Sequence, residues 1–159
     1  MTPRKQQSER DGGFTLVELL VIIVIVGVLA GIAIPIFLHQ KGKAADATAR
    51  SDLRNLAVAE ESYATDNISA YGTATELAAA GQRLPVSAED TVYVYTSGPA
   101  GYCMVGHSNN SDVYLVYDSQ HGGMQAPEAS LAAAQGVCAD AGYSPGGAVV
   151  HDSSGLHVS

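Results

Sequence analysis

The side chain in the most unusual chemical setting is Glu18, which lies near the start of an apolar run of 25 residues that ends at Leu38. An acidic residue deep in a membrane helix costs about 2.5 to 3.5 kcal/mol, and less near the helix ends. Such a carboxylate can stay charged only if it gains a positive partner. An amine from another copy of the chain would supply one, and the ion pair would favour one axial register between packed helices.

No other pattern in the sequence is typical of catalysis or metal binding. The histidines show neither H-x-x-x-H nor H-E-x-x-H spacing, and the sequence has no Cys-x-x-Cys. The glycine pairs do not follow a strand-then-helix pattern, so a phosphate-binding loop is not supported. We therefore predict that the chain is not an enzyme and has no metal, cofactor or small-molecule substrate. The five histidines are His39, His107, His121, His151 and His157.

One long helix is predicted from Phe14 to about residue 64, and it must position Glu18. Residues 14–38 are apolar on every side, whereas residues 39–65 are amphipathic. At 1.5 Å per residue the helix would be about 75 Å long, so roughly half of it must lie in a membrane or among other subunits. Three residues predict a kink or a local loosening in the apolar half: Gly27, Gly31 and Pro35.

The stretch Gly12-Gly13-Phe14-Thr15-Leu16-Val17-Glu18-Leu19-Leu20 resembles the N-terminus of a type IV pilin precursor. That family includes the pseudopilins of type II secretion and DNA-uptake machines. The resemblance implies that prepilin peptidase cuts between Gly13 and Phe14, and that the new amine of Phe14 is methylated. It also implies that Glu18 is the carboxylate used in filament assembly. The close match covers roughly residues 12–38.

The resemblance implies four segments: a leader (1–13), a transmembrane and assembly helix (14–38), an amphipathic half-helix (39–65) and a globular head (66–159). Basic residues in the leader would keep the N-terminus in the cytoplasm and place the head outside. The implied location is a single pass of the cytoplasmic membrane, followed by a cell-surface filament. The implied partners are prepilin peptidase, identical subunits, an inner-membrane assembly platform and membrane lipid before assembly.

The head is predicted to be a small antiparallel sheet packed on the amphipathic half-helix, which gives an α+β fold. Residues 91–96, 102–107 and 113–118 have strand character and are separated by connectors of hairpin length. Thr73-Ala74-Thr75-Glu76 fits a capping box that opens a short helix ending near Gly81. Spacing of 3.6 residues predicts which helix residues face the head: Leu53, Leu56, Ala57, Tyr63 and Ala64.

The C-terminal region is rich in glycine, alanine and serine, and we predict that residues 119–159 are loosely structured. A short helix is expected near residues 127–134, with an edge strand at 148–151. In an oxidising compartment Cys103 and Cys138 are expected to form one disulfide, and pilin heads are similar in this respect. The alternative is two buried free thiols.

Two interpretations concern ligands of the head. Asp112, Asp118 and the glycines at 122 and 123 could belong to a calcium loop of the kind found in some major pseudopilins. Their spacing lacks the alternation of an EF-hand, so solvated acidic turn residues are the preferred interpretation. No lysine or arginine follows Arg83 in a chain of net charge −8, which argues against a broad basic surface for nucleic acid.

The leading hypothesis is a structural subunit of a type IV pilus-like filament, used in adhesion, motility or DNA uptake. The second is a pseudopilin of a type II secretion or competence system, and the third is a single-pass anchored binding module that never polymerises. In that third case Glu18 would reach the membrane interface by snorkelling. A conventional secretory signal is disfavoured because its apolar region is about 7 to 15 residues long and ends in an A-x-A-like site.

Overall fold

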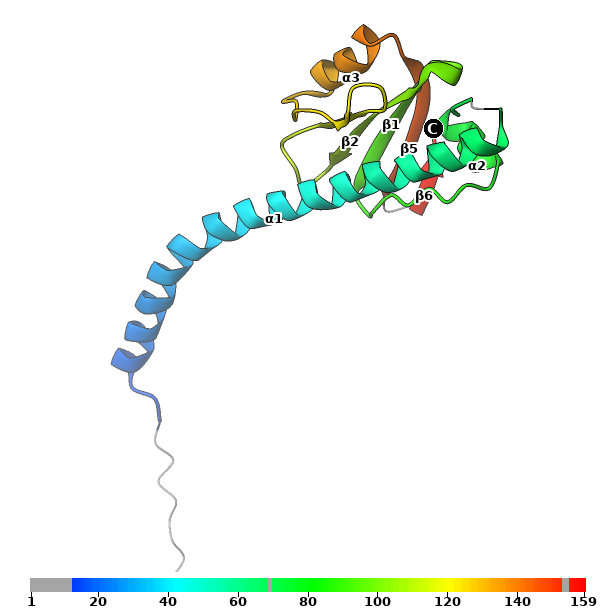
Figure 1. Ribbon diagram of the computed structural model, residues 1–159. Coiled ribbons are helices and arrows are strands. Elements are labelled where there is room, and N and C mark those ends of the chain that lie inside the picture. The colour runs from blue at the N-terminus through cyan, green and yellow to red at the C-terminus, as the bar shows by residue number, and fades with distance from the viewer. Residues whose placement is uncertain (1–12, 69, 153–154) are drawn as a thin grey trace, which may run out of the picture. The chain divides into compact units, whose positions relative to one another are not determined.

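A computed structural model describes residues 13–68, 70–152 and 155–159 (Figure 1). Residues 1–12, which make up nearly all of the predicted leader, lie outside the described residues. The chain divides into two compact units, Met1–Leu38 and His39–Ser159. Helix α1, Leu16–Asp66, has 51 residues and contributes to both units. It begins two residues after the predicted start and confirms the predicted long helix.

The first unit contains the apolar part of α1. The helix remains α-helical through Gly27, Gly31 and Pro35. The kink or loosening expected at these residues therefore stays a prediction. Every side chain from Phe14 to Leu38 is exposed except Ala30, which is partly exposed.

The second unit contains a six-stranded antiparallel sheet with the strand order β4-β3-β2-β1-β5-β6. Strands β1 to β4 form a meander, and the β5–β6 hairpin pairs with the other side of β1. The α+β fold and the antiparallel meander are thus confirmed. The strands are β1 (Asp90–Thr96), β2 (Tyr102–Ser108), β3 (Leu115–Asp118), β4 (Gly123–Met124), β5 (Ser144–Asp152) and β6 (Gly155–Val158).

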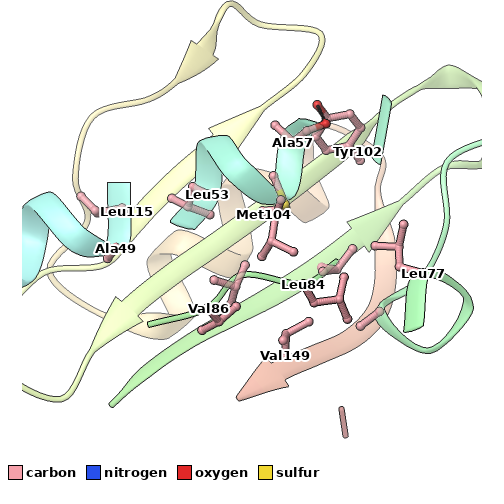
Figure 2. Close-up of a cluster of buried hydrophobic side chains, with 14 residues drawn as sticks. Ala49, Leu53, Ala57, Leu77, Leu84, Val86, Tyr102, Met104, Leu115 and Val149 are labelled. Atoms are coloured by element: carbon pink, nitrogen blue, oxygen red, sulfur yellow. Dashed lines mark hydrogen bonds between the residues drawn. The ribbon is translucent and has the colours of Figure 1, made fainter. Parts of the chain in front are cut away.

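Helices cover both faces of this sheet (Figure 1). The C-terminal half of α1 and the short helix α2 (Ala74–Ala79) pack on one face, and α3 (Leu131–Asp140) packs on the other. Residues of β2 alternate between the faces, so that Tyr102 and Met104 contact the α1 side while Cys103 and Val105 contact the α3 side. Figure 2 shows Leu53 and Ala57 of α1 beside Met104 and Tyr102.

The predicted head-facing residues of α1 are confirmed. Leu53 and Leu56 are fully buried, Ala57 and Ala64 are nearly so, and Tyr63 packs against the same cluster. The capping box of α2 is also present, since the Thr73 hydroxyl accepts a hydrogen bond from the backbone N–H of Glu76 and the Glu76 carboxylate accepts one from the backbone N–H of Thr73.

The prediction of a loose C-terminal region was wrong. Helix α3 begins at Leu131, not near residue 127, because the Ser130 hydroxyl caps it by accepting a hydrogen bond from the N–H of Ala133. It continues to Asp140, past the predicted end, and buries Ala134 and Cys138. Strand β5 is not an edge strand, because it pairs with β1 on one side and β6 on the other.

Two smaller differences concern the loops, whereas the predicted disulfide is present. Strand β3 begins at Leu115, not at residue 113, because Tyr114 instead forms an isolated bridge with Glu128. A short 3₁₀ helix, η1 (Gly98–Ala100), lies between β1 and β2. Cys103 of β2 and Cys138 of α3 are joined in a disulfide, which ties α3 to the sheet.

Candidate assembly segment

The N-terminal end of α1 is held by Thr15 and Glu18. The Glu18 carboxylate oxygen Oε2 accepts hydrogen bonds from the Thr15 backbone N–H at 2.9 Å and from the Thr15 hydroxyl at 2.8 Å. The Thr15 hydroxyl in turn accepts one from the Glu18 backbone N–H at 3.2 Å. This reciprocal arrangement is a capping box, which satisfies backbone donors that the first turn of a helix leaves unpaired. Glu18 therefore has a local structural role within a single chain.

The residues at the expected cleavage position are open to solvent. Phe14 is 79% exposed. A Cβ atom added to Gly13 would meet no other atom within 4 Å. The described residues therefore set no steric requirement for glycine at position 13.

The apolar surface of α1 between Leu16 and Leu38 is not covered by any of the described residues. Its large side chains are 47 to 79% exposed. Among the described residues, α1 is the one helix with the length and composition to cross a membrane. A continuous apolar surface of this extent requires lipid or another apolar surface in contact with it.

Asp118, a candidate calcium ligand in the head, already binds other residues of the chain. The buried Asp118 accepts hydrogen bonds from the Tyr143 hydroxyl at 2.9 Å and the Gln120 N–H at 2.9 Å, and pairs with His121 at 2.7 Å. Burial raises the pKa of Asp118, but these hydrogen bonds outweigh it and hold the pKa below its ordinary value. Within the described ranges, no three His, Cys, Asp or Glu residues are grouped to hold a metal ion. Asp112 is exposed and takes no part in these hydrogen bonds of Asp118.

Sequence reasoning identified Glu18 but missed Thr15. The signal was available, because Thr15-x-x-Glu18 has the same spacing as the Thr73-x-x-Glu76 box that was predicted correctly. It also missed three acidic residues that the head buries: Asp52, Glu60 and Asp90. Asp52 and Glu60 lie at helical spacing among the buried residues of α1, which places them on the face against the sheet.

An uncovered apolar helix followed by an α+β head defines a class of membrane-anchored protein, and comparisons with known proteins identify the family. A family model described as the prokaryotic N-terminal methylation motif matches residues 10–34. The type II secretion system core protein G of Klebsiella pneumoniae is 37% identical over 114 residues, which are 72% of this chain and 80% of that protein. The type IV wide pilus major component PilA4 of Thermus thermophilus is 32% identical over 100 residues, 62% of this chain and 76% of that protein.

The chain therefore belongs to the family of type IV pilins and type II secretion pseudopilins. Other relatives are matched over a smaller part of their length. The type IV major pilin PilA of Myxococcus xanthus is 34% identical over 76 residues, which are 48% of this chain and 34% of that protein. Core protein G of Pseudomonas aeruginosa is likewise matched over 42% of its length.

Proposed function

We propose that the chain is the structural subunit of a type IV pilus-like filament. It is stored in the membrane as a precursor, cleaved after Gly13, methylated at Phe14 and polymerised through residues 14–38. The observation that carries the proposal is the apolar part of α1, which none of the described residues covers. Lipid covers this surface before assembly, and the same part of other subunits covers it afterwards.

Glu18 would serve assembly in addition to capping the helix. Both hydrogen bonds from Thr15 use Oε2, and a carboxylate has a second oxygen that can accept hydrogen bonds. The Phe14 amine of a neighbouring subunit would donate to it in a largely apolar surrounding. An ion pair there favours one register, because any other register leaves a charge without a partner.

The two glycines in the apolar part of α1, Gly27 and Gly31, favour packing against other subunits over packing within the chain. Glycine within a helix costs about 1 kcal/mol relative to alanine. A Cβ at Gly27 or Gly31 would meet no atom of the described residues within 4 Å, just as at Gly13. Close approach of other helices, or local loosening of α1 in the filament, would give the two helical glycines a use.

The proposal implies the following partners and locations. Prepilin peptidase and an inner-membrane assembly platform act on the precursor, which passes once through the cytoplasmic membrane with its head outside. The product is a cell-surface filament of identical subunits, and the subunit itself performs no catalysis.

A second candidate function is that of a pseudopilin. It is favoured by the extent of the match to core protein G of Klebsiella pneumoniae, which covers 80% of that protein. Electron microscopy of cells at native expression separates the two, because a pilin forms long surface filaments and a pseudopilin does not.

The first experiment is the intact mass of the protein purified from its native membrane fraction. A mature chain that begins with N-methylated Phe14 is the expected result. In Gly13→Asp the precursor should accumulate at its full mass. A wild-type chain that still begins at Met1 or Thr2 at steady state would refute the proposal and favour the anchored binding module.

The second experiment separates the charge of Glu18 from its capping role. Glu18→Gln keeps a side chain that can complete a capping box, whereas the matched control Thr15→Val removes the capping hydroxyl and keeps the carboxylate. We expect both to be cleaved, and only Glu18→Gln to lose most of its sheared-filament yield. Normal filaments from Glu18→Gln would exclude the ion pair. Loss in both variants would show that assembly needs the cap as well as the charge of Glu18.

A further inference from the structure

The basic residues that follow residue 13 gather on one helix. The chain has five of them, and four lie on the C-terminal half of α1. Three of these four recur on one side of the helix, because at about 100° per residue they fall within roughly 40° of one another. We name these three, Lys43, Arg50 and Arg54, the basic stripe. The other two basic residues are Lys41 and Arg83.

The basic stripe has no acidic partner among the described residues. Two of its side chains are exposed, and that of Arg50 is partly exposed. Asp46 lies one helical turn before Arg50, but its carboxylate accepts a hydrogen bond from the Ser111 hydroxyl instead. In the described part of the chain the one ion pair joins His121 to Asp118. The stripe is therefore available to an acidic surface of another molecule.

Glu61 lies on the same side of α1 as the basic stripe, two turns after Arg54. Its side chain is exposed, and Oε1 accepts a hydrogen bond from the Tyr102 hydroxyl at 3.2 Å. That bond orients the carboxylate and leaves lone pairs for a cation. The helix ends at Asp66 with no basic residue in its last turn. One side of α1 thus changes from positive to negative along its length.

The spacing of these charges suits a second copy of the chain. Two turns of helix separate Arg54 from Glu61 by about 10 Å, and no ion pair joins them within the described residues. Two parallel copies of α1 that are offset by two turns would bring Arg54 of one copy beside Glu61 of the other. The same offset would lay the positive part of one stripe along the negative end of the next helix.

We propose that Arg54 of each subunit pairs with Glu61 of a neighbouring subunit and sets the axial offset of the heads at about 10 Å. This inference rests on the proposed function, because a filament of parallel subunits repeats one offset at every contact. The pairing of the Phe14 amine with Glu18 needs an offset in the same direction, since in both pairs the acid follows the cation in the sequence. Complementary charges of this kind select a register between surfaces.

Anionic lipid is the competing partner for the basic stripe. Lys41 and Lys43 follow Leu38 within two turns of helix, where the headgroups of a membrane would lie. Arg54 is about 24 Å of helix beyond Leu38, which exceeds the reach of a surface potential that decays within a Debye length of about 8 Å. Binding to lipid would also be independent of Glu61. A partner that carries the complementary acid explains both ends of the pattern.

The test exchanges the two charges in cells that express the full chain. Arg54→Glu and Glu61→Arg should each lower the yield of sheared filaments about tenfold, because like charges then face each other. The double variant Arg54→Glu, Glu61→Arg should regain most of the wild-type yield, because the pair is restored with its signs exchanged. Lipid binding predicts no such rescue.

Arg83→Glu is the matched control, because it makes the same change in net charge at an exposed base outside the stripe. Arg83 lies beside Asn55 and Ser62, which are on a different side of α1 from the stripe. We expect this variant to assemble like wild type. A loss as large as that of Arg54→Glu would overturn the pairing and assign the effect to net charge.

Neutral variants keep the test valid if a charge reversal disturbs the head. Circular dichroism of each purified full chain in detergent reports its fold, and the Tyr102 hydroxyl still donates to the Ala57 carbonyl oxygen at 3.4 Å when Glu61 is replaced. Arg54→Gln and Glu61→Gln should each reduce filament yield several-fold, and the double neutral variant should lose no more than either one. Losses that multiply in the double variant would overturn the pairing.

The readouts separate failure of this pairing from failure of the proposed function. Cleavage after Gly13 should occur in every variant, since the exchanged residues lie in the head half of α1. Normal filament yield from Arg54→Glu would overturn the pairing and leave the filament itself intact. Absence of filaments from wild type would refute the proposed function and the pairing with it.

Discussion

Glu60 is the buried acid whose replacement should change stability most clearly. Its side chain is fully buried on α1 against the head. Oε2 accepts a hydrogen bond from the N–H of Gly72 at 3.0 Å, and Oε1 has no partner among the described residues. Burial is the main cause that raises its pKa to about 7. The Gly72 hydrogen bond opposes the rise, and the carboxylates of Glu61 and Glu76 add to it.

The sign of the effect follows from the two pKa values. In the unfolded chain Glu60 titrates near 4.5, and in the folded chain near 7. The folded state therefore binds the proton more tightly, and stability is full below about pH 4.5 and falls as the pH rises through about 7. Each pKa unit is worth about 1.4 kcal/mol, so ionisation of Glu60 costs the fold about 3 kcal/mol at pH 8.

Glu60→Gln removes the charge and keeps an oxygen that can accept from Gly72. We expect the variant to be about 2 to 3 kcal/mol more stable than wild type at pH 8 and equal to it at pH 4.5. The lower figure allows for the new amide donors, which also need partners. Urea titrations of the full chain in detergent with chelator, followed by circular dichroism from pH 4.5 to 8, measure this difference.

A comparison with an exposed glutamate isolates the effect of burial. Glu89 is exposed and accepts from the side chain of Asn109. Glu89→Gln should follow the wild-type pH profile, because a solvated carboxylate contributes little. The reasoning about Glu60 is refuted if Glu60→Gln and wild type show the same stability difference at pH 4.5 and at pH 8.

Three further predictions concern packing and the disulfide, all measured by urea denaturation. Leu53→Ala should lower the free energy of unfolding by about 2 to 5 kcal/mol, since it empties a fully buried position between α1 and the sheet. Gly106→Val should cost about 1 to 3 kcal/mol, because a Cβ there would lie 3.0 Å from Leu53. Additive losses in the Gly106→Val, Leu53→Ala double variant would exclude that clash. Replacing Cys103 and Cys138 by alanine should cost about 4 kcal/mol, from a sequence separation of 35, and reduction of wild type should cost as much.

Local periodicity was enough to predict the helix and the meander. Leu53 and Leu56 lie at the spacing of an amphipathic helix, and both are buried against the sheet. The connectors around residues 98–101 and 108–111 have hairpin length, and the strands on either side pair in sequence order. These are short-range signals, which a single sequence carries.

The C-terminal elements depend on contacts that are distant in the sequence. Residues 144–148 contain proline and two glycines, which read locally as a turn, yet they begin β5. Gly146 is needed there because a Cβ would lie 3.1 Å from the backbone oxygen of Val94. Helix α3 is buried through Ala134 and Cys138 against a face of the sheet that includes Cys103, whose separation from Cys138 in the sequence is 35. Such pairings are set by tertiary structure, which overrides local propensity.

The burial of Asp52, Glu60 and Asp90 could not be predicted from local sequence patterns either. Asp52 and Glu60 fit the helical spacing of the buried face, but their charges make a solvated position the ordinary expectation. Only the folded head shows that Ser87 and Gly72 satisfy part of each carboxylate. Glu60 and Asp90 each keep one buried oxygen without a hydrogen-bond partner among the described residues.

The two capping boxes separate local structure from function. Thr15 with Glu18 and Thr73 with Glu76 make the same set of hydrogen bonds at the start of their helices. The geometry of the cap therefore cannot be what assembly uses. What differs is the surrounding surface, since Glu18 begins an apolar helix that no described residue covers, while Glu76 begins a short helix packed on the sheet. A charge at the edge of a surface that other subunits cover can favour one register between them, and for that reason the assembly role is proposed for Glu18 and not for Glu76.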